Sequence, residues 1–127
     1  MVERGATTVW EEWGGVDADG IPHASLNHYS KGGFITFLHQ HVAGLRLIEP
    51  GYRHFRVAPR PGGGLRWAEA HHDSPYGPID VRWERGGDRL DVHVTVPPGT
   101  TAEVLLPTGT STLRSGRHTI SSAYATA

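Results

Sequence analysis

The chain has 127 residues, which is enough for one compact domain or for a small domain with an additional segment. Twelve Lys and Arg nearly balance thirteen Asp and Glu, so the formal net charge of −1 provides no basic face of the kind that binds nucleic acid or an anionic membrane. The absence of cysteine excludes disulfides and thiolate metal sites. No apolar run resembles a signal peptide or a membrane span, so we expect a cytoplasmic protein with neither nucleic acid nor membrane as a partner.

The first 48 residues predict an irregular segment that ends in a helix. "TTVWEEW" (7–13) predicts an extended piece, and a Gly- and Asp-rich loop follows it up to residue 29. Ser30 is the predicted cap of a helix, and Gly44 weakens its end. An apolar stripe at helical spacing is formed by Phe34, Phe37, Leu38, Val42 and Leu45. We expect this stripe to pack on barrel helices outside the chain or, without them, to fold back or form a homodimer.

Residues 49–127 predict an antiparallel β-sandwich. Short β-branched or aromatic runs alternate with Gly- and Pro-rich turns, and Leu90, Val92, Val94 and Val96 place apolar groups on one face of a strand. "TLRSGRHTI" (112–120) predicts a terminal hairpin around Ser115-Gly116. The five other predicted strands cover 53–59, 65–73, 78–85, 89–97 and 101–107. Two packed antiparallel sheets, with a domain boundary near residue 48, are therefore expected.

The stretch "VWEEW" (9–13) contains two glutamates between two tryptophans. In an extended strand Glu11 and Glu12 point in opposite directions, so only one of them can face a given cleft. An aromatic ring beside a carboxylate is a common sugar-binding arrangement, because the ring packs on the C–H face of the sugar while the carboxylate accepts from a hydroxyl or activates a water. The same residues also fit an edge strand with two solvated glutamates.

"NHYSKGG" (27–33) lies at the start of the predicted helix, where unpaired N–H groups favour oxygen-rich ligands. Asn27 and His28 can both hydrogen-bond to hydroxyls, although helix capping beside a surface histidine explains them equally well. Gly33, His39 and His41 imitate a cupin metal motif, but two histidines at this spacing on a helix face different directions. We therefore predict no metal and no cofactor.

Four segments in order resemble the C-terminal end of bacterial α-L-rhamnosidases of glycoside hydrolase family 78. They are "GATTVWEEW", "SLNHYSKGGF", the run from Val42 to Arg85 and "VTVPPGTTAEVLLP", and the resemblance covers roughly residues 4–120. It implies that residues 1–48 are the end of the family's (α/α)6 catalytic barrel. Residues 49–127 would then be the jelly-roll-like β-sandwich that follows the barrel.

The resemblance also implies roles for individual residues. The family's Trp-Glu motif matches Trp10 and Glu11, which makes Glu11 the general base, with Trp10 and Trp13 beside it in substrate binding. Its Asn-His-Tyr element matches Asn27 and His28, which are then substrate-binding residues. Inverting hydrolysis of terminal α-L-rhamnosides needs a second carboxyl group about 6.5–9.5 Å away. The family's general acid lies earlier in the barrel, so we expect a rhamnosidase fragment that is inactive alone, with the remainder of the barrel and a rhamnoside as partners.

Two other functions stay open at this point. A non-catalytic carbohydrate-binding sandwich would show exposed, coplanar aromatic rings, for which Trp67 and Trp83 are the candidates. Both alternate with apolar neighbours, which favours core packing. A purely structural module that braces a barrel would instead show an apolar helix surface and no affinity for sugars.

Overall fold

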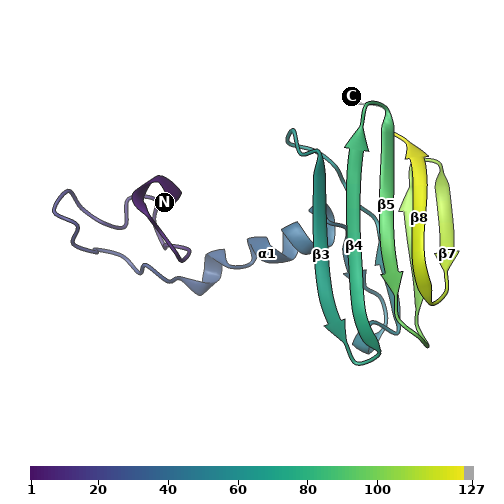
Figure 1. Ribbon diagram of the computed structural model, residues 1–127. Helices are drawn as coiled ribbons and strands as arrows, with labels where there is room; N and C mark the ends of the chain where they lie inside the picture. The colour runs from purple at the N-terminus through teal and green to yellow at the C-terminus, as the bar shows by residue number, and fades with distance from the viewer. Residues whose placement is uncertain (125–127) are drawn as a thin grey trace. The chain divides into compact units, whose positions relative to one another are not determined.

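The computed structural model describes residues 1–124, and Figure 1 shows the course of the chain. Its internal contacts define two compact units, Met1–Thr36 and the residues from Phe37 onward, which we call the N-terminal unit and the sandwich unit. The predicted domain boundary near residue 48 stays a prediction, because a unit defined by contacts need not coincide with an inherited domain. No helix in the described residues is long and apolar enough to cross a membrane.

The N-terminal unit consists mainly of loops. Its regular elements are two short 3₁₀ turns, η1 (Val2–Arg4) and η2 (Tyr29–Lys31), and the start of helix α1 (Phe34–Phe37); one isolated bridge joins Val16 to Pro22. The extended piece predicted at 7–13 forms no strand, because the backbone bends at residues 7–8 and again at 11–12 and then turns at residues 13–14. Loop-to-loop hydrogen bonds take the place of a sheet, as described for the candidate site below.

The predicted helix is shorter and less regular than its apolar spacing indicated. Helix α1 (Phe34–Phe37) runs directly into the π-helical turn η3 (Leu38–Val42). Ser30 does not cap this helix; its backbone N–H is instead bound by the side chain of His28 at the start of η2. Leu45 was predicted to continue the helical stripe, but it begins strand β1 and is fully buried.

Gly44 separates the helical turn from the sheet. Its φ of 90° lies in the left-handed region, and a Cβ at this position would come within 2.4 Å of the backbone nitrogen of Pro59. Gly44 also accepts a hydrogen bond from the N–H of Ala58 through its carbonyl group. Only glycine combines this backbone conformation with such close packing.

The sandwich unit contains two four-stranded sheets. The prediction of a β-sandwich is confirmed, and the five predicted internal strands lie within a few residues of their expected positions. In the first sheet the order is β1 (Leu45–Leu47), β2 (His54–Val57), β6 (Thr101–Leu106) and β7 (Gly109–Leu113). In the second sheet the order is β3 (Trp67–Ser74), β4 (Gly77–Gly86), β5 (Arg89–Val96) and β8 (Gly116–Ala123). The short 3₁₀ turn η4 (Pro50–Tyr52) connects β1 to β2.

Two features of the strand pairing differ from the sequence-based expectation. Strands β2 and β6 pair in parallel, whereas all other neighbours are antiparallel. The predicted terminal hairpin around Ser115-Gly116 is wrong, because β7 pairs with β6 and β8 pairs with β5. The turn between them therefore carries the chain from one sheet to the other, as Figure 1 shows.

The core lies between the two sheets. The predicted alternation in β5 is confirmed, since Leu90, Val92, Val94 and Val96 are all buried. Trp83 is fully buried, and its indole N–H donates to the carbonyl oxygen of Val42 at 2.7 Å, which ties η3 to the sandwich core. The complete core cluster is Leu45, Phe55, Val57, Ile79, Val81, Trp83, Leu90, Val92, Val94, Val96, Ala102 and Val104.

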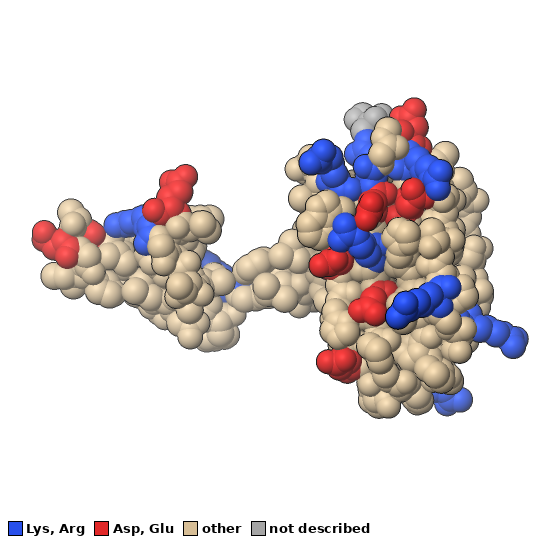
Figure 2. Space-filling model, in the orientation of Figure 1, with Lys and Arg blue, Asp and Glu red and all other residues tan. Residues whose placement is uncertain are grey.

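The outer face of the second sheet is polar. Acidic and basic side chains are interspersed over this part of the surface, which Figure 2 shows. Arg82 lies between Glu69 and Glu84, at 2.9 and 2.8 Å, and these hydrogen bonds raise the pKa of its guanidinium group. Hydrogen bonds from the Ser121 hydroxyl and from Arg89 lower the pKa of Asp91. Charges on this face are therefore largely matched within the sheet.

Candidate functional site

Glu11 is held at the point where the two halves of the N-terminal loop meet. Its backbone N–H donates to the carbonyl oxygen of Ser25 at 2.8 Å, and one carboxylate oxygen, Oε2, accepts from the backbone N–H of Ser25 at 3.1 Å. A second link joins the same stretches, because the N–H of His28 donates to the carbonyl oxygen of Val9 at 2.8 Å. Residues that are distant in sequence are thereby brought to one place.

His28 faces the other carboxylate oxygen of Glu11. Its Nε2 lies 3.8 Å from Glu11 Oε1, and the two side chains are 26% and 45% exposed. On the opposite side of the ring, Nδ1 lies 2.7 Å from the hydroxyl oxygen of Ser30. The ring also stacks on Tyr29, with centroids 5.2 Å apart and an angle of 13° between the planes. The imidazole is thus oriented by three neighbours and remains accessible.

Lys31 was not singled out by the sequence, yet it contacts this group. Its ammonium group donates to the backbone carbonyl oxygen of Glu11. Because Lys31 closes the turn that begins after His28, this bond ties η2 to the backbone of Glu11. A long cationic side chain in "NHYSK" (27–31) is too common a feature to have indicated such a contact.

The remaining predicted site residues lie in the same unit but in different environments. Trp10 is buried, with 6% of its surface exposed, whereas Trp13 is 77% exposed. Asn27 is exposed beside His28. Trp13 therefore offers the larger ring surface to a ligand, and Trp10 is the main buried side chain of the loop.

The two adjacent glutamates have different partners. Glu12 faces His23, with 3.8 Å between Oε2 and Nε2, and its side chain is 62% exposed. It accepts no backbone hydrogen bond of the kind that Ser25 gives to Glu11 among those found in residues 1–124. Glu11 is the better oriented carboxylate, and Glu12 is the more solvated one.

This arrangement can support proton transfer. A carboxylate with one oxygen bound to a backbone N–H and the other directed at an imidazole is positioned to take a proton from water or from a sugar hydroxyl. The separation of 3.8 Å is longer than a hydrogen bond, so a third group is needed to connect the two side chains. Across residues 1–124 no three His, Asp or Glu side chains are grouped in a way that could hold a metal ion.

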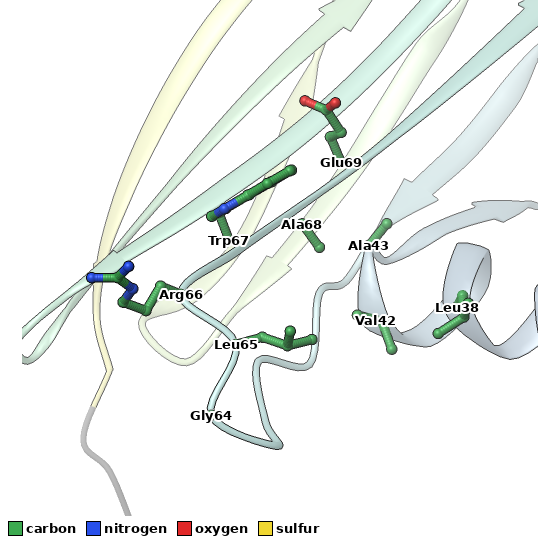
Figure 3. Close-up of a pocket in the computed structure, with 9 residues that line it drawn as sticks. All are labelled: Leu38, Val42, Ala43, Gly64, Leu65, Arg66, Trp67, Ala68 and Glu69. Atoms are coloured by element: carbon green, nitrogen blue, oxygen red, sulfur yellow. The ribbon is translucent and has the colours of Figure 1, made fainter. Parts of the chain in front are cut away.

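The sandwich unit has an apolar groove of its own, which Figure 3 shows. It lies between η3 and the start of β3 and is lined mainly by Leu38, Val42, Ala43, Leu65, Trp67 and Ala68. Trp67 is 51% exposed and carries the guanidinium group of Arg82 over its ring at 4.6 Å. Trp83 is fully buried, so the two tryptophans do not form the exposed aromatic pair that a carbohydrate-binding sandwich would require.

Comparison with known proteins gives matches along nearly the whole chain. The family described as bacterial alpha-L-rhamnosidase C-terminal domain matches residues 44–121, and the family described as bacterial alpha-L-rhamnosidase 6 hairpin glycosidase domain matches residues 1–42. An alpha-L-rhamnosidase from Streptomyces avermitilis is 36% identical over 84% of the chain, and one from Formosa agariphila is 36% identical over 87%. The chain spans only 11% and 12% of the lengths of these two relatives.

Solved structures agree with this assignment. The α-L-rhamnosidase from Aspergillus terreus is similar with a TM-score of 0.85 and 34% identity, over 94% of this chain and 15% of that one. The Streptomyces avermitilis enzyme, whose crystal structure was determined with L-rhamnose, is similar with a TM-score of 0.83 and 28% identity, over 95% of this chain and 14% of that one. The chain therefore belongs to the bacterial α-L-rhamnosidase family, and its β-sandwich is the C-terminal domain of that family.

Proposed function

We propose that the N-terminal unit supplies the general-base side of an α-L-rhamnosidase active site, which the rest of the catalytic barrel completes. Glu11 acts as the base, and His28 and Asn27 bind the hydroxyls of a terminal rhamnose. The exposed ring of Trp13 forms the apolar part of the sugar site, and the buried ring of Trp10 supports the loop by packing, with only its small exposed edge open to the ligand. The observation that carries this proposal is the juxtaposition of Glu11 and His28, which the loop-to-loop hydrogen bonds of Val9 and Ser25 maintain.

The proposed reaction is hydrolysis with inversion at the anomeric carbon. Glu11 takes a proton from a water molecule, whose oxygen forms the new bond to the anomeric carbon as the bond to the leaving oxygen breaks. A carboxylic acid outside residues 1–127 donates a proton to that leaving oxygen. The products are free rhamnose and the alcohol, and each of the two carboxyl groups has changed its protonation state once.

The proposal predicts that the chain is inactive alone, because it contains the general base but not the general acid. We expect no release of 4-nitrophenol from 4-nitrophenyl α-L-rhamnoside above the buffer rate. Turnover that copurifies with the chain and disappears in Glu11→Gln would contradict the proposed division between this chain and the rest of the barrel.

A chimera tests the role of Glu11 directly. The matching C-terminal segment of the Streptomyces avermitilis relative is replaced by this chain, and activity is compared among variants. Glu11→Gln should lower kcat by at least about 10²-fold with little change in KM, because the base acts in the transition state. His28→Ala should raise KM, and Glu12→Gln is the matched control expected to keep turnover. Normal turnover in Glu11→Gln would remove Glu11 from the mechanism.

The apolar side chains of the helix support a proposal for where the rest of the barrel contacts this chain. Phe34, Phe37 and Leu38 are 48, 57 and 45% exposed, which is unusual for three large apolar side chains so close in sequence. We assign them to contacts with barrel helices outside the chain and, when those helices are missing, to a homodimer. Light scattering of the chain should show dimers that Phe37→Ser dissociates, and a strictly monomeric chain would refute the dimer.

A further inference from the structure

The residues that follow His28 hold its ring in a defined way. Two polar groups of Ser30 approach Nδ1: the hydroxyl oxygen at 2.7 Å and the backbone nitrogen at 3.4 Å. A backbone N–H can only donate a hydrogen bond, so Nδ1 must act as the acceptor. A ring nitrogen of neutral histidine that accepts carries no proton, and the proton then lies on Nε2.

The opposite side of the ring favours the same form. Nε2 is directed at the carboxylate oxygen Oε1 of Glu11, 3.8 Å away. In the other neutral form the lone pair of Nε2 would face this anionic oxygen, which is electrostatically unfavourable, whereas an Nε2–H is attracted to it. Both neighbours of the ring therefore select the same tautomer, through different nitrogens.

We propose that Ser30 is a positioning residue that holds neutral His28 in the Nε2–H tautomer. His28 thereby presents a hydrogen-bond donor beside the Glu11 carboxylate and binds an oxygen of the ligand that accepts. The stacking of Tyr29 and the bond from Lys31 to the Glu11 backbone keep the ring and the carboxylate facing each other. The inference rests on the proposed function for the identity of the ligand, while the tautomer is a property of the chain itself.

Nitrogen-15 NMR of the labelled full chain measures the tautomer. At about pH 8 an ordinary histidine is neutral, and the two ring nitrogens then differ strongly in chemical shift according to which one carries the proton. The spectrum of His28→Gln identifies the signals of His28 among the nine histidines. We expect a proton-free Nδ1 and a protonated Nε2, and a protonated Nδ1 in the native chain would overturn the proposal.

Variants of Ser30 separate its hydroxyl from a general effect on folding. Ser30→Ala keeps only the long backbone contact of 3.4 Å at Nδ1 and loses the hydroxyl contact of 2.7 Å, so the signals of His28 should shift toward a mixture of tautomers. Ser30→Thr, which keeps a hydroxyl, should restore the native spectrum. Ser25→Ala is the matched control, because the Ser25 hydroxyl accepts from the Asn27 N–H and does not contact His28. Native signals in Ser30→Ala, or no recovery in Ser30→Thr, would show that the hydroxyl does not select the tautomer.

The chimera described above adds a functional readout. If His28 binds substrate as a donor, Ser30→Ala should raise KM roughly three- to tenfold, the range expected for one weakened hydrogen bond, with a smaller change in kcat. An inactive chimera with the expected NMR spectrum would count against the proposed function and leave the tautomer established. An active chimera in which Ser30→Ala changes neither KM nor the spectrum would refute the role of Ser30.

Discussion

The two units of this chain are stabilised in different ways. In the N-terminal unit, Trp10 is the one buried hydrophobic side chain among the described residues, and hydrogen bonds between loops connect the segments around Glu11 and His28. In the sandwich unit, twelve buried side chains form a continuous core between two sheets. Loops of this kind commonly carry binding and catalytic residues, whereas packed sheets provide rigidity. The candidate site therefore lies in the N-terminal unit, whereas most of the buried apolar surface that stabilises the fold lies in the sandwich unit.

Two N-terminal deletions of different length should show the largest difference between the two units. Removal of residues 1–36 leaves the core intact, but removal of 1–48 also deletes strand β1, the buried Leu45 and the carbonyl group that binds Trp83. The loss of one buried leucine already costs about 2–5 kcal/mol. We expect a folded sandwich from the first deletion and a strongly destabilised or unfolded one from the second. Circular dichroism during urea unfolding decides this, and equal midpoints would contradict it.

Two tryptophan substitutions test which unit carries the global stability. Trp83→Ala should lower the free energy of unfolding of the sandwich by about 3–5 kcal/mol, because it leaves a cavity and an unpaired carbonyl at Val42. Trp10→Ala should disorder the loop around Glu11 and leave the unfolding of the sandwich unchanged. Amide NMR spectra separate these effects, and loss of the sandwich signals in Trp10→Ala would show that the two units do not unfold separately.

Two glycine substitutions test how much the close backbone packing before strand β1 contributes to the stability of the sandwich unit. Gly44→Ala should destabilise the sandwich by about 3 kcal/mol, because its Cβ would meet the backbone of Ala58 and Pro59 at 2.4–2.6 Å and φ is positive. Gly63→Ala has a positive φ but nothing within 4 Å, so we expect a cost of about 1 kcal/mol. Thermal unfolding of both variants measures the difference, and similar melting temperatures would show that the backbone around Gly44 yields easily.

The smallest expected effect is the pH dependence contributed by His71. Hydrogen bonds to Asp80 and Asp73 raise the pKa of His71 above its ordinary value of 6.5. Because the folded state favours the protonated ring, this contribution to stability is complete below about pH 6.5 and is lost as the pH rises through the higher pKa of the folded state. The native chain should therefore lose more stability than His71→Gln between about pH 5.5 and 8.5. Parallel urea midpoints across this range would contradict the prediction.

The sandwich was largely predictable from the sequence because its signals are local. Alternating apolar residues in β5 and the Gly- and Pro-rich turns between runs identify half-buried strands without knowledge of their partners. Strand partners depend on contacts between distant segments, so neither the parallel pairing of β2 with β6 nor the separation of β7 from β8 was predicted. Leu45 illustrates the same limit: it fits a helical stripe in sequence but is buried in the core, where Gly44 has already turned the chain.

For the candidate site, the sequence by itself determined which residue types are available for the proposed chemistry, and the tertiary structure decided how these candidate residues are arranged. The adjacent glutamates and the Asn-His-Tyr element were recognised from residue types and from their resemblance to a family. Loop closure alone decided that Glu11 faces His28 while Glu12 faces His23, because the backbone bends where an extended strand was expected. The contacts of Ser30 with His28 and of Lys31 with Glu11 also emerged only from the folded chain, since hydrogen bonds between loops leave no periodic pattern in a sequence.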